Sequence, residues 1–264
     1  MPEILVVMPT LGERLDTLAE SIESVTSQAG VRTRLVVVVP EAAEAARETA
    51  ERAGATLVDD PRRGLSAAVN AGIGARKDET YYAWLNDDDF FAPGALARLV
   101  AMLEARPDAS VAYGACVYID DVGRTIGVSR AGDLASRILG WGPDLVPQPA
   151  ALHRLDAVAE AGEYDESLRF AMDLDMLLRL RRVGPFVSTK EVVSSFRWHA
   201  DSLTVANRKM SLAESERVKH RYLAPSARRV APLWDVPVRL ATHVAARQVS
   251  RKARKLAAAP AGGV

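Results

Sequence analysis

The first third of the chain alternates between short apolar runs and segments in which apolar residues recur every three or four positions. The apolar runs predict four strands, at residues 4–8, 35–39, 56–58 and 81–85. The segments between them predict three helices, at residues 13–28, 41–53 and 66–75. A run as uniformly apolar as residues 4–8 is typical of a parallel sheet that is covered on both faces. The alternation therefore predicts an α/β fold with a mainly parallel sheet and flanking crossover helices.

The rest of the chain departs from this alternation. A helix that runs to about Glu104 and a strand at residues 111–118 precede a predicted hairpin turn at residues 120–123. Beyond the turn we expect a helix near residues 154–161 and an apolar helix led by Asp173. We divide the chain into two halves of one domain and a tail, at residues 1–120, 121–225 and 226–264.

Composition agrees with a globular body and sets the tail apart. The chain has 264 residues, 48% of them apolar, and a formal net charge of zero, so we expect no nucleic-acid partner. From residue 226 onward there are eight basic residues and one acidic residue, a balance of +7 that leaves −7 on the body. A basic tail on an acidic body predicts contact with an anionic surface.

The apolar residues of the tail add to this prediction. Leu240, Val244 and Val249, placed among basic residues, predict a basic amphipathic helix that makes peripheral contact with an anionic membrane. A solvated helix, a helix packed on the acidic body, and contact with a second subunit in a homodimer are the alternatives. The start of the tail is expected to be broken up by its prolines, Pro225, Pro232 and Pro237.

Cysteine usage and the N-terminal residues bear on the compartment. Cys116 is the only cysteine, so it cannot form a disulfide within the chain, and this favours a reducing environment. The first apolar run has no basic segment before it, and no stretch of about 18 apolar residues exists that could span a bilayer. We expect a cytoplasmic protein, at the inner face of the membrane if the tail binds lipid.

Polar residues follow each of the four predicted strands, and ligands of open α/β sheets bind where strands end. The strongest signal is the run from Asn86 to Asp89, because three consecutive carboxylates repel one another unless a cation or hydrogen-bond donors compensate. Mg²⁺ or Mn²⁺ on a substrate diphosphate usually takes one or two protein carboxylates. The run therefore predicts a metal site. A solvated acidic turn, with Asp89 at the next helix N-terminus, is the alternative.

Two further groups of residues are candidates for chemistry. Asp173 and Asp175 lie at a predicted helix start, where either can act as a general base; helix capping by Asp173 and an ion pair between Asp175 and Arg179 are equally open. Arg197 and His199 leave a predicted strand together, which suits a diphosphate or a metal, although a lone histidine is more often structural.

Residues 62–66 combine two arginines with the start of a helix. Such a turn can hold phosphate oxygens, and it can equally be a plain surface turn. The chain has no Walker-type phosphate loop and no GxGxxG pattern, which argues against nucleoside triphosphatases and dinucleotide-dependent dehydrogenases.

Five groups of residues, in this order, resemble the family-2 glycosyltransferases of the GT-A (Rossmann-like) fold over about residues 3–205. They are residues 7–10; 63–72; 84–89 with 93–96; 148–149, 162–166 and 173–175; and 196–203. The resemblance implies that residues 1–120 bind a nucleotide sugar and that residues 121–225 bind the acceptor. It also implies inverting transfer of a sugar, with Mn²⁺ or Mg²⁺ as cofactor, from a UDP-, dTDP- or GDP-sugar to a hydroxyl. The acceptor would be a glycan or a lipid-linked molecule, in cell-envelope or polysaccharide synthesis.

The resemblance assigns a role to each matching residue. Asp173 would be the base that deprotonates the acceptor hydroxyl. Metal contact would come from Asp88 first, with Asp89 and His199. The donor would meet Pro9, Thr10, Glu41, Asp60, Arg63, Ser66, Asn70, Asp87 and Arg197. The acceptor would meet Gln148, Met172, Asp175 and Trp198. Because Val39 is followed by Pro40 and not by the family's usual aspartate, Glu41 or Asp60 is expected to contact the base or ribose.

Two other functions are compatible with this pattern. A sugar-phosphate nucleotidyltransferase shares the sheet type and the need for metal, but residues 9–14 are a poor match to its glycine-rich basic loop. A non-catalytic protein that binds glycans or nucleotide sugars is the second alternative, and the presence of both Asp88 and Asp173 argues against it.

Overall fold

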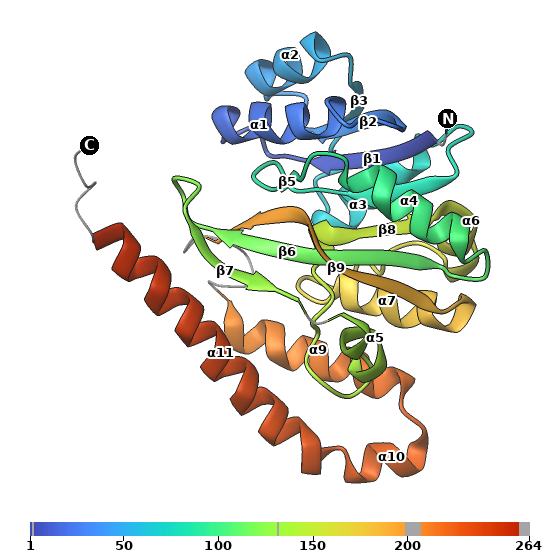
Figure 1. The fold of residues 1–264 in the computed structure, drawn as a ribbon, viewed down its shortest axis with the longest axis vertical. Coiled ribbons are helices and arrows are strands. Elements are labelled where there is room, and N and C mark those ends of the chain that lie inside the picture. The colour runs from blue at the N-terminus through green and yellow to red at the C-terminus, as the bar shows by residue number, and fades with distance from the viewer. Residues whose placement is uncertain (2, 131, 199–206, 259–264) are drawn as a thin grey trace.

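One nine-stranded sheet runs through both predicted halves of the domain, with helices on both faces (Figure 1). The structure is a computed structural model, and it describes residues 1, 3–130, 132–198 and 207–258. Eight strands follow the order β3-β2-β1-β4-β8-β6-β9-β5, and β7 pairs with β6 outside this path. The predicted α/β fold with flanking helices is confirmed.

The N-terminal part is the predicted parallel βα repeat. Its strands are β1 (Glu3–Pro9), β2 (Arg32–Val39), β3 (Thr56–Asp59) and β4 (Tyr81–Trp84). Its helices are α1 (Leu15–Thr26), α2 (Glu44–Arg52) and α3 (Leu65–Gly74). All neighbouring strands here are parallel, so the carboxyl ends of β1, β2, β3 and β4 meet at one edge of the sheet, as expected.

The second part of the sheet is mixed in direction. Its elements are β5 (Phe90–Phe91), α4 (Ala95–Ala105), β6 (Val111–Ile119), β7 (Thr125–Ser129), α5 (Asp133–Ile138), a 3-10 turn (Gln148–Ala150), β8 (Ala151–Arg154), α6 (Leu155–Ala161), α7 (Met172–Val183) and β9 (Phe186–Arg197). Strand β8 lies antiparallel between β4 and β6, while β9 is parallel to β6 and antiparallel to β5. Strands β6 and β7 form the predicted hairpin around residues 120–123.

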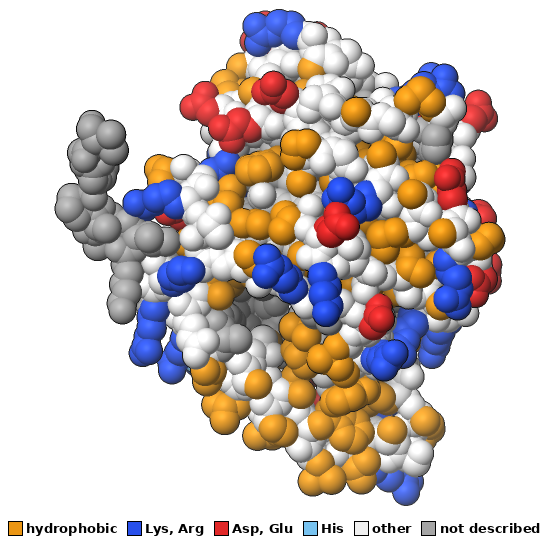
Figure 2. Space-filling model, viewed as in Figure 1, with side chains coloured by type: hydrophobic (Ala, Val, Ile, Leu, Met, Phe, Trp, Pro, Cys, Tyr) orange, Lys and Arg blue, Asp and Glu red, His pale blue; other side chains and the backbone are white. Residues whose placement is uncertain are grey.

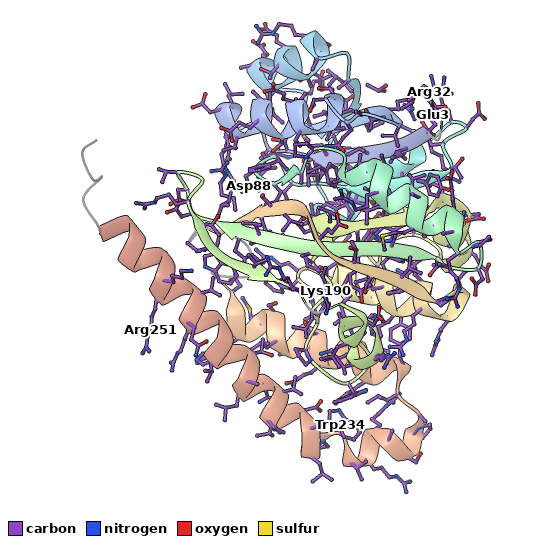
Figure 3. All side chains as sticks on the ribbon, viewed as in Figure 1. Glu3, Arg32, Asp88, Lys190, Trp234 and Arg251 are labelled. Atoms are coloured by element: carbon purple, nitrogen blue, oxygen red, sulfur yellow. The ribbon has the colours of Figure 1, made fainter. Side chains whose placement is uncertain are left out.

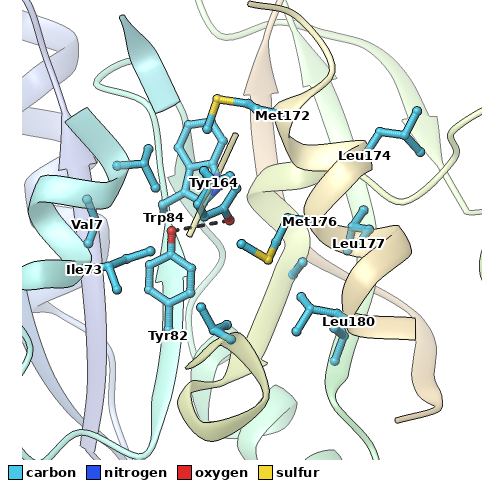
Figure 4. Close-up of a cluster of buried hydrophobic side chains, with 14 of the residues drawn as sticks. Val7, Ile73, Tyr82, Trp84, Tyr164, Met172, Leu174, Met176, Leu177 and Leu180 are labelled. Atoms are coloured by element: carbon cyan, nitrogen blue, oxygen red, sulfur yellow. Dashed lines mark hydrogen bonds between the residues drawn. The ribbon is translucent and has the colours of Figure 1, made fainter. Parts of the chain in front are cut away.

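Alternate residues of each central strand feed two separate cores, because successive side chains of a strand point to opposite faces. On one face Val7 and Trp84 pack with α3, α6 and α7 (Figure 4). On the other face Val6 and Ala83 pack with α1, α2 and α4. Burial on both faces explains why these strands read as continuous apolar runs. Cys116 lies in the second core, where burial raises the pKa of its thiol to about 12.

Three helices follow the described part of the sheet: α9 (Arg208–Tyr222), α10 (Pro225–Val230) and α11 (Pro232–Ala258). The expectation that prolines break up the tail is only partly right. Pro225 and Pro232 begin helices, where the missing N–H costs nothing, but Pro237 lies inside α11. In the described part of the chain, no helix has the length and apolar character needed to cross a membrane.

Helix α3 lies unusually close to the sheet at Gly72. A Cβ atom at this position would be 2.3 Å from Val7 Cγ1 and 3.1 Å from Val38 Cγ2. Gly74 belongs to the same helix, and a Cβ atom there would have no neighbour within 4 Å. The close approach of α3 to β1 and β2 therefore depends on the missing side chain of Gly72.

We predict that Gly72→Ala lowers the free energy of unfolding by about 1–3 kcal/mol, because the added methyl group overpacks the interface between α3 and β1. Gly74→Ala is the matched control and should be neutral or slightly stabilising, since alanine favours a helix more than glycine does. Denaturant unfolding of both variants measures this. Equal stability of the two variants would contradict the proposed close packing.

Candidate active site

The acidic run from Asn86 to Asp89 follows β4 at the edge where the parallel strands end, next to a pocket of about 350 Å³. The ends of β1, β2 and β3 supply the other walls of this pocket, through Pro9, Thr10, Val38 and Asp60. The predicted position of the site is therefore the position of a cavity. Figure 3 labels Asp88 at this edge of the molecule.

Thr10 and Asp87 join the ends of β1 and β4 inside the pocket. Thr10 Oγ1 donates a hydrogen bond of 2.5 Å to Asp87 Oδ2 and accepts one of 2.9 Å from the Gly12 backbone N–H. Burial raises the pKa of Asp87 above its ordinary value, and the neighbouring Asp88 carboxylate adds to this, while Thr10 and Arg14 oppose it. Two residues predicted to bind a donor therefore form one rigid wall of the cavity.

Asp88 pairs with Arg14, a residue that was not among those predicted from the sequence. Its Oδ2 accepts a hydrogen bond from Arg14 Nη1, and the same guanidinium lies 4.0 Å from Asp87 Oδ1. Arg14 is half exposed, whereas both aspartates are nearly buried. The acidic run thus holds a cation in this structure. Arg14 lies five residues after the end of β1, so its place near the predicted site could have been inferred from the sequence.

Asp89 faces inward, away from the pocket. It is fully buried, and its two carboxylate oxygens accept hydrogen bonds of 2.9 Å each, from Asn86 Nδ2 and from the Arg197 backbone N–H. Burial raises its pKa well above the ordinary value, and the charge of Asp88 adds to that. These contacts give Asp89 the role of a brace for the acidic loop, and its metal role stays a prediction.

Arg197 also braces this loop, although we predicted that it contacts the donor. Its guanidinium donates to the backbone oxygens of Asp88 at 3.2 Å and Asp121 at 2.9 Å, and pairs with Glu20 at 2.9 Å. Only 8% of Arg197 is exposed. An arginine with all three nitrogens engaged behind the loop fixes its backbone and does not face the pocket.

The turn after β3 closes the pocket on its other side. Asp60 Oδ1 accepts a hydrogen bond of 2.8 Å from the Arg62 backbone N–H, and Arg62 has a φ of +57°. A positive φ is rare for a residue with a side chain, and here it turns Arg62 into the pocket lining with Asp60 and Gly64. The arginine predicted from sequence was Arg63.

Four residues predicted to bind the donor lie away from the pocket lining. Arg63 pairs with Glu166 at 2.9 Å, and Glu41 is exposed beyond β2. Ser66 Oγ donates to the Leu168 backbone oxygen at 3.2 Å, and Asn70 exchanges two hydrogen bonds of 2.9 Å with the Tyr164 backbone. Ser66 and Asn70 belong to α3, and Arg63 lies just before it. These three side chains therefore tie the first half of the domain to the loop before α7.

Asp173, the predicted base, lies in the first turn of α7. Burial raises its pKa, and the charge of Glu214 adds to this. Desolvation and the charge of Asp173 raise the pKa of Asp144 to about 7, although the Asp144 side chain still reaches solvent. Nothing in the sequence separated Asp144 from other surface aspartates.

The three other residues predicted near the acceptor, Met172, Gln148 and Asp175, make different contacts. Met172 is buried beside Trp84 (Figure 4), so the start of α7 adjoins the end of β4. Gln148 Nε2 donates to the Trp84 backbone oxygen at 2.6 Å. Asp175 is 3% exposed and pairs with Arg179 at 2.9 Å and with the Tyr222 hydroxyl at 2.7 Å. The ion-pair alternative for Asp175 is therefore the one that the structure contains.

The C-terminal end of β9 supplies the last predicted residues. Trp198 makes edge-on ring contacts with Tyr118 and Phe196, at 5.8 and 6.2 Å between ring centroids. Its backbone N–H donates to Ile119 at 2.8 Å. His199, the predicted third metal ligand, lies outside the described residues, as does the segment to residue 206. Among the residues that are described, no group of three or more metal-binding side chains occurs.

Glu214 on α9 holds the loop that leads to Asp173. One oxygen of its carboxylate accepts hydrogen bonds from three consecutive backbone N–H groups, those of Arg169 at 3.1 Å, Phe170 at 2.5 Å and Ala171 at 2.9 Å. The side chain is 5% exposed. A buried carboxylate that satisfies three amides fixes the start of α7 and hence the place of Asp173.

The match to a known family extends over more than half of the chain. Residues 5–161 match the family described as Glycosyl transferase family 2. The chain belongs to glycosyl transferase family 2. The matched residues include β1 from Leu5 onward, β2, β3, β4, the acidic run and β8, and end with α6.

Solved structures with the same fold include a mannosyltransferase and a protein bound to a nucleotide sugar. The mannosyltransferase PcManGT from Pyrobaculum calidifontis, in complex with GDP-Man and Mn²⁺, has a TM-score of 0.68 at 18% identity, over 100% of this chain and 76% of that one. S. aureus TarS 1–349, in complex with UDP-GlcNAc, has a TM-score of 0.64 at 14% identity, over 83% of this chain and 65% of that one. At such identities the likeness is one of fold, and it confirms the predicted GT-A architecture.

A curated relative is far longer than this chain. The uncharacterized protein y4gI of Sinorhizobium fredii is 28% identical over 254 residues, which cover 90% of this chain and 27% of that protein. The chain therefore spans about a quarter of the length of this relative.

We predict that Glu214→Ala destabilises the protein by roughly 3 kcal/mol, because three amides lose a charged acceptor in a buried position. The matched control is Glu216→Ala on the same helix, which removes a surface ion pair with Arg239 and should cost much less. Denaturant unfolding measures both. A loss no larger than that of the control would show that Glu214 does not hold the loop.

Proposed function

We propose that this chain is an inverting glycosyltransferase, which moves a sugar from a nucleotide diphosphate to an acceptor hydroxyl. The observation that carries the proposal is the pocket at the ends of the parallel strands, which Asp87 and Arg14 line. Asp88 binds this arginine, and the half-buried Asp173 lies beyond β4. Membership of glycosyl transferase family 2 supports glycosyl transfer. The two structural neighbours, solved with GDP-Man and UDP-GlcNAc, support a nucleotide sugar as the donor.

The donor would occupy the pocket with its nucleoside deep and its diphosphate near the acidic run. Pro9, Thr10 and Asp87 would border the nucleoside, with Asp60 as the acidic group available to ribose or base. Arg62 and Arg14, which both line the pocket, provide cationic charge for phosphate oxygens. A UDP-, dTDP- or GDP-sugar fits this lining.

The donor set near Asp88 fits a hard divalent cation. The acidic run already accepts a guanidinium from Arg14, and a cation shared with a diphosphate needs only one or two carboxylates. Asp88 would hold Mn²⁺ or Mg²⁺, with Asp87 beside it and His199 as a third candidate. The ion would neutralise charge on the departing diphosphate. Arg14 would then turn from Asp88 toward the phosphates.

Asp173 would take the proton of the acceptor hydroxyl as its oxygen attacks the anomeric carbon, while the bond to the nucleoside diphosphate breaks on the opposite side. The raised pKa of Asp173 suits a general base that works near neutral pH. Asp144 would hold the acceptor or share the proton. Gln148 and Trp198 border the same region, which suits a glycan or lipid-linked acceptor of cell-envelope or polysaccharide synthesis.

The first test is turnover of nucleotide sugars by Asp88→Asn. A screen by thermal shift with Mn²⁺ identifies the donor, because a bound ligand stabilises the folded state. We expect Asp88→Asn to reduce donor turnover by roughly 100-fold and to remove the increase in Tm that depends on Mn²⁺. Asp78→Asn, an exposed surface change, is the control. Unchanged turnover in Asp88→Asn would rule out its metal role, and binding without any turnover would favour the non-catalytic alternative.

The second test is the pH dependence of kcat/KM. Asp173 must be deprotonated to act, so kcat/KM should fall as pH drops through the raised pKa of Asp173. The charge of Asp173 raises the pKa of Asp144, so Asp173 loses its proton first, and Asp144→Asn should leave this acid limb in place. Asp173→Asn removes the base and should lower kcat/KM by roughly 100-fold or more and abolish the limb. Glu163→Gln, an exposed charge removal, should change neither. A limb that persists in Asp173→Asn would rule out Asp173 as the base.

A further inference from the structure

Helices α10 and α11 carry a row of exposed aliphatic side chains on their outer surface, which we call the aliphatic stripe. Its members are Val230, Leu233, Val236, Leu240 and Val244, which are 46%, 76%, 60%, 65% and 45% exposed. The spacing of three and four from Leu233 to Val244 places these four along one side of α11, and Val230 ends α10 just before them. Figure 2 shows hydrophobic side chains gathered at the end of the molecule where α10 and the start of α11 lie.

The opposite side of these helices is fixed to the body. Ala231 is fully buried, and Asp235 pairs with His220 of α9 at 2.8 Å. Arg239 pairs with Glu216 of α9 at 2.7 Å. These contacts set the rotation of α11, and so the aliphatic stripe faces outward in the folded protein. The sequence alternative of a helix packed on the acidic body therefore describes the inner face of α11, whereas the aliphatic stripe takes no part in that contact.

Basic residues flank the aliphatic stripe at both ends. Arg228 and Arg229 precede it, and Arg247, Arg251 and Lys252 follow it; all five are exposed. Within the described residues none of the five forms an ion pair, in contrast to Arg239. The only acidic residue from position 226 onward is Asp235, and it is 8% exposed. The outer surface of α10 and α11 is therefore aliphatic and positively charged, with no compensating acid.

We infer that this surface docks on an anionic lipid bilayer, with α11 lying in the plane of the headgroups. Aliphatic side chains enter the acyl boundary while basic side chains meet anionic headgroups, and this combination defines an interfacial helix. A second copy of the chain fits poorly. Because both ends of the aliphatic stripe are basic, either direction of helix pairing brings like charges together. A nucleic acid would satisfy the basic residues and leave the aliphatic stripe in water.

Docking would also orient the candidate active site. Helix α11 runs from α10 and contacts β7 of the hairpin next to the acidic loop. Figure 3 shows Arg251 on the same side of the molecule as Asp88, with Trp234 at the far end of α11. A bilayer under α11 would lie beside the edge of the sheet that holds the pocket. The docking does not depend on the proposed transferase activity, but it suits an acceptor anchored in lipid.

The experiment is co-sedimentation of the full chain with vesicles of phosphatidylcholine alone and of phosphatidylcholine mixed with phosphatidylglycerol. We expect binding to the mixed vesicles only, and weaker binding at high salt because exposed charges are screened. If the chain does not bind the mixed vesicles at low salt, the inference is overturned, whether or not the chain transfers sugar. Equal binding to both vesicles would overturn the role of the basic residues.

Matched variants separate the two contributions. Leu240→Ser should weaken binding by roughly fivefold through lost apolar burial, whereas Leu134→Ser, 57% exposed on α5, should bind as the unmodified chain does. The triple change Arg247→Gln, Arg251→Gln and Lys252→Gln should weaken binding by about tenfold or more. Its control removes the same charge elsewhere, through Arg52→Gln, Arg76→Gln and Lys77→Gln.

The outcomes are distinct because all the substituted side chains are exposed, and circular dichroism checks that each variant remains folded. Equal loss in a variant and its control would reduce the effect to net charge and refute a specific surface. Concentration-dependent dimerisation that Leu240→Ser abolishes, without vesicle binding, would assign the surface to a second copy and refute the lipid proposal.

Discussion

The structure depends on holding three consecutive carboxylates in one loop at the end of a buried strand. Each carboxylate is compensated differently: Asp87 by the Thr10 hydroxyl, Asp88 by the Arg14 guanidinium, and Asp89 by the Asn86 amide and a backbone N–H. Without these donors the repulsion and the loss of hydration would destabilise the loop. The donors come from β1, from the start of α1 and from β9, so the loop forms only when the sheet has assembled. The arginine that compensates Asp88 is half exposed and lines the pocket, so a ligand in the pocket can reach it.

A second set of contacts joins residues 1–120 to residues 121–225, the two predicted halves of the domain. Helix α3 reaches the loop before α7 through Ser66 and Asn70, and α9 reaches the same loop through Glu214. The loop is therefore held from both sides at the start of α7, the helix that carries Asp173. Ser66 and Asn70, which the resemblance assigned to the donor, thus help to set the distance between the pocket and Asp173.

The C-terminal helices α10 and α11 are held in place by contacts of the same kind, and these contacts decide which residues lie on the outer surface. Their inner face is bound to α9 by the hydrogen bond between His220 and Asp235 and by the ion pair between Arg239 and Glu216. Because α9 also carries Glu214, the tail and the loop that leads to Asp173 share one support. A surface that docks on lipid through α11 would then be coupled rigidly to this loop. The aliphatic stripe is exposed because the charged partners of Asp235 and Arg239 decide which face turns inward.

The sequence alone determined the strands, the crossover helices and the edge of the sheet at which polar residues meet, because burial on both faces leaves continuous apolar runs and parallel strands end together. It also pointed to Asp87 in the pocket lining and to Asp88, which binds the pocket residue Arg14. It could not tell that Arg62, not Arg63, turns into the pocket, or that Arg197, Ser66 and Asn70 face structural partners, because the direction of a side chain is set by its neighbours in space. Three other features join residues that lie at least 29 positions apart in the chain. They are the mixed direction of β8 and β9, the effect of the Asp173 charge on Asp144, and the contact of Glu214 with the loop before α7. Only the tertiary structure decided these, since no local pattern encodes which distant segment will supply a charge or a hydrogen bond.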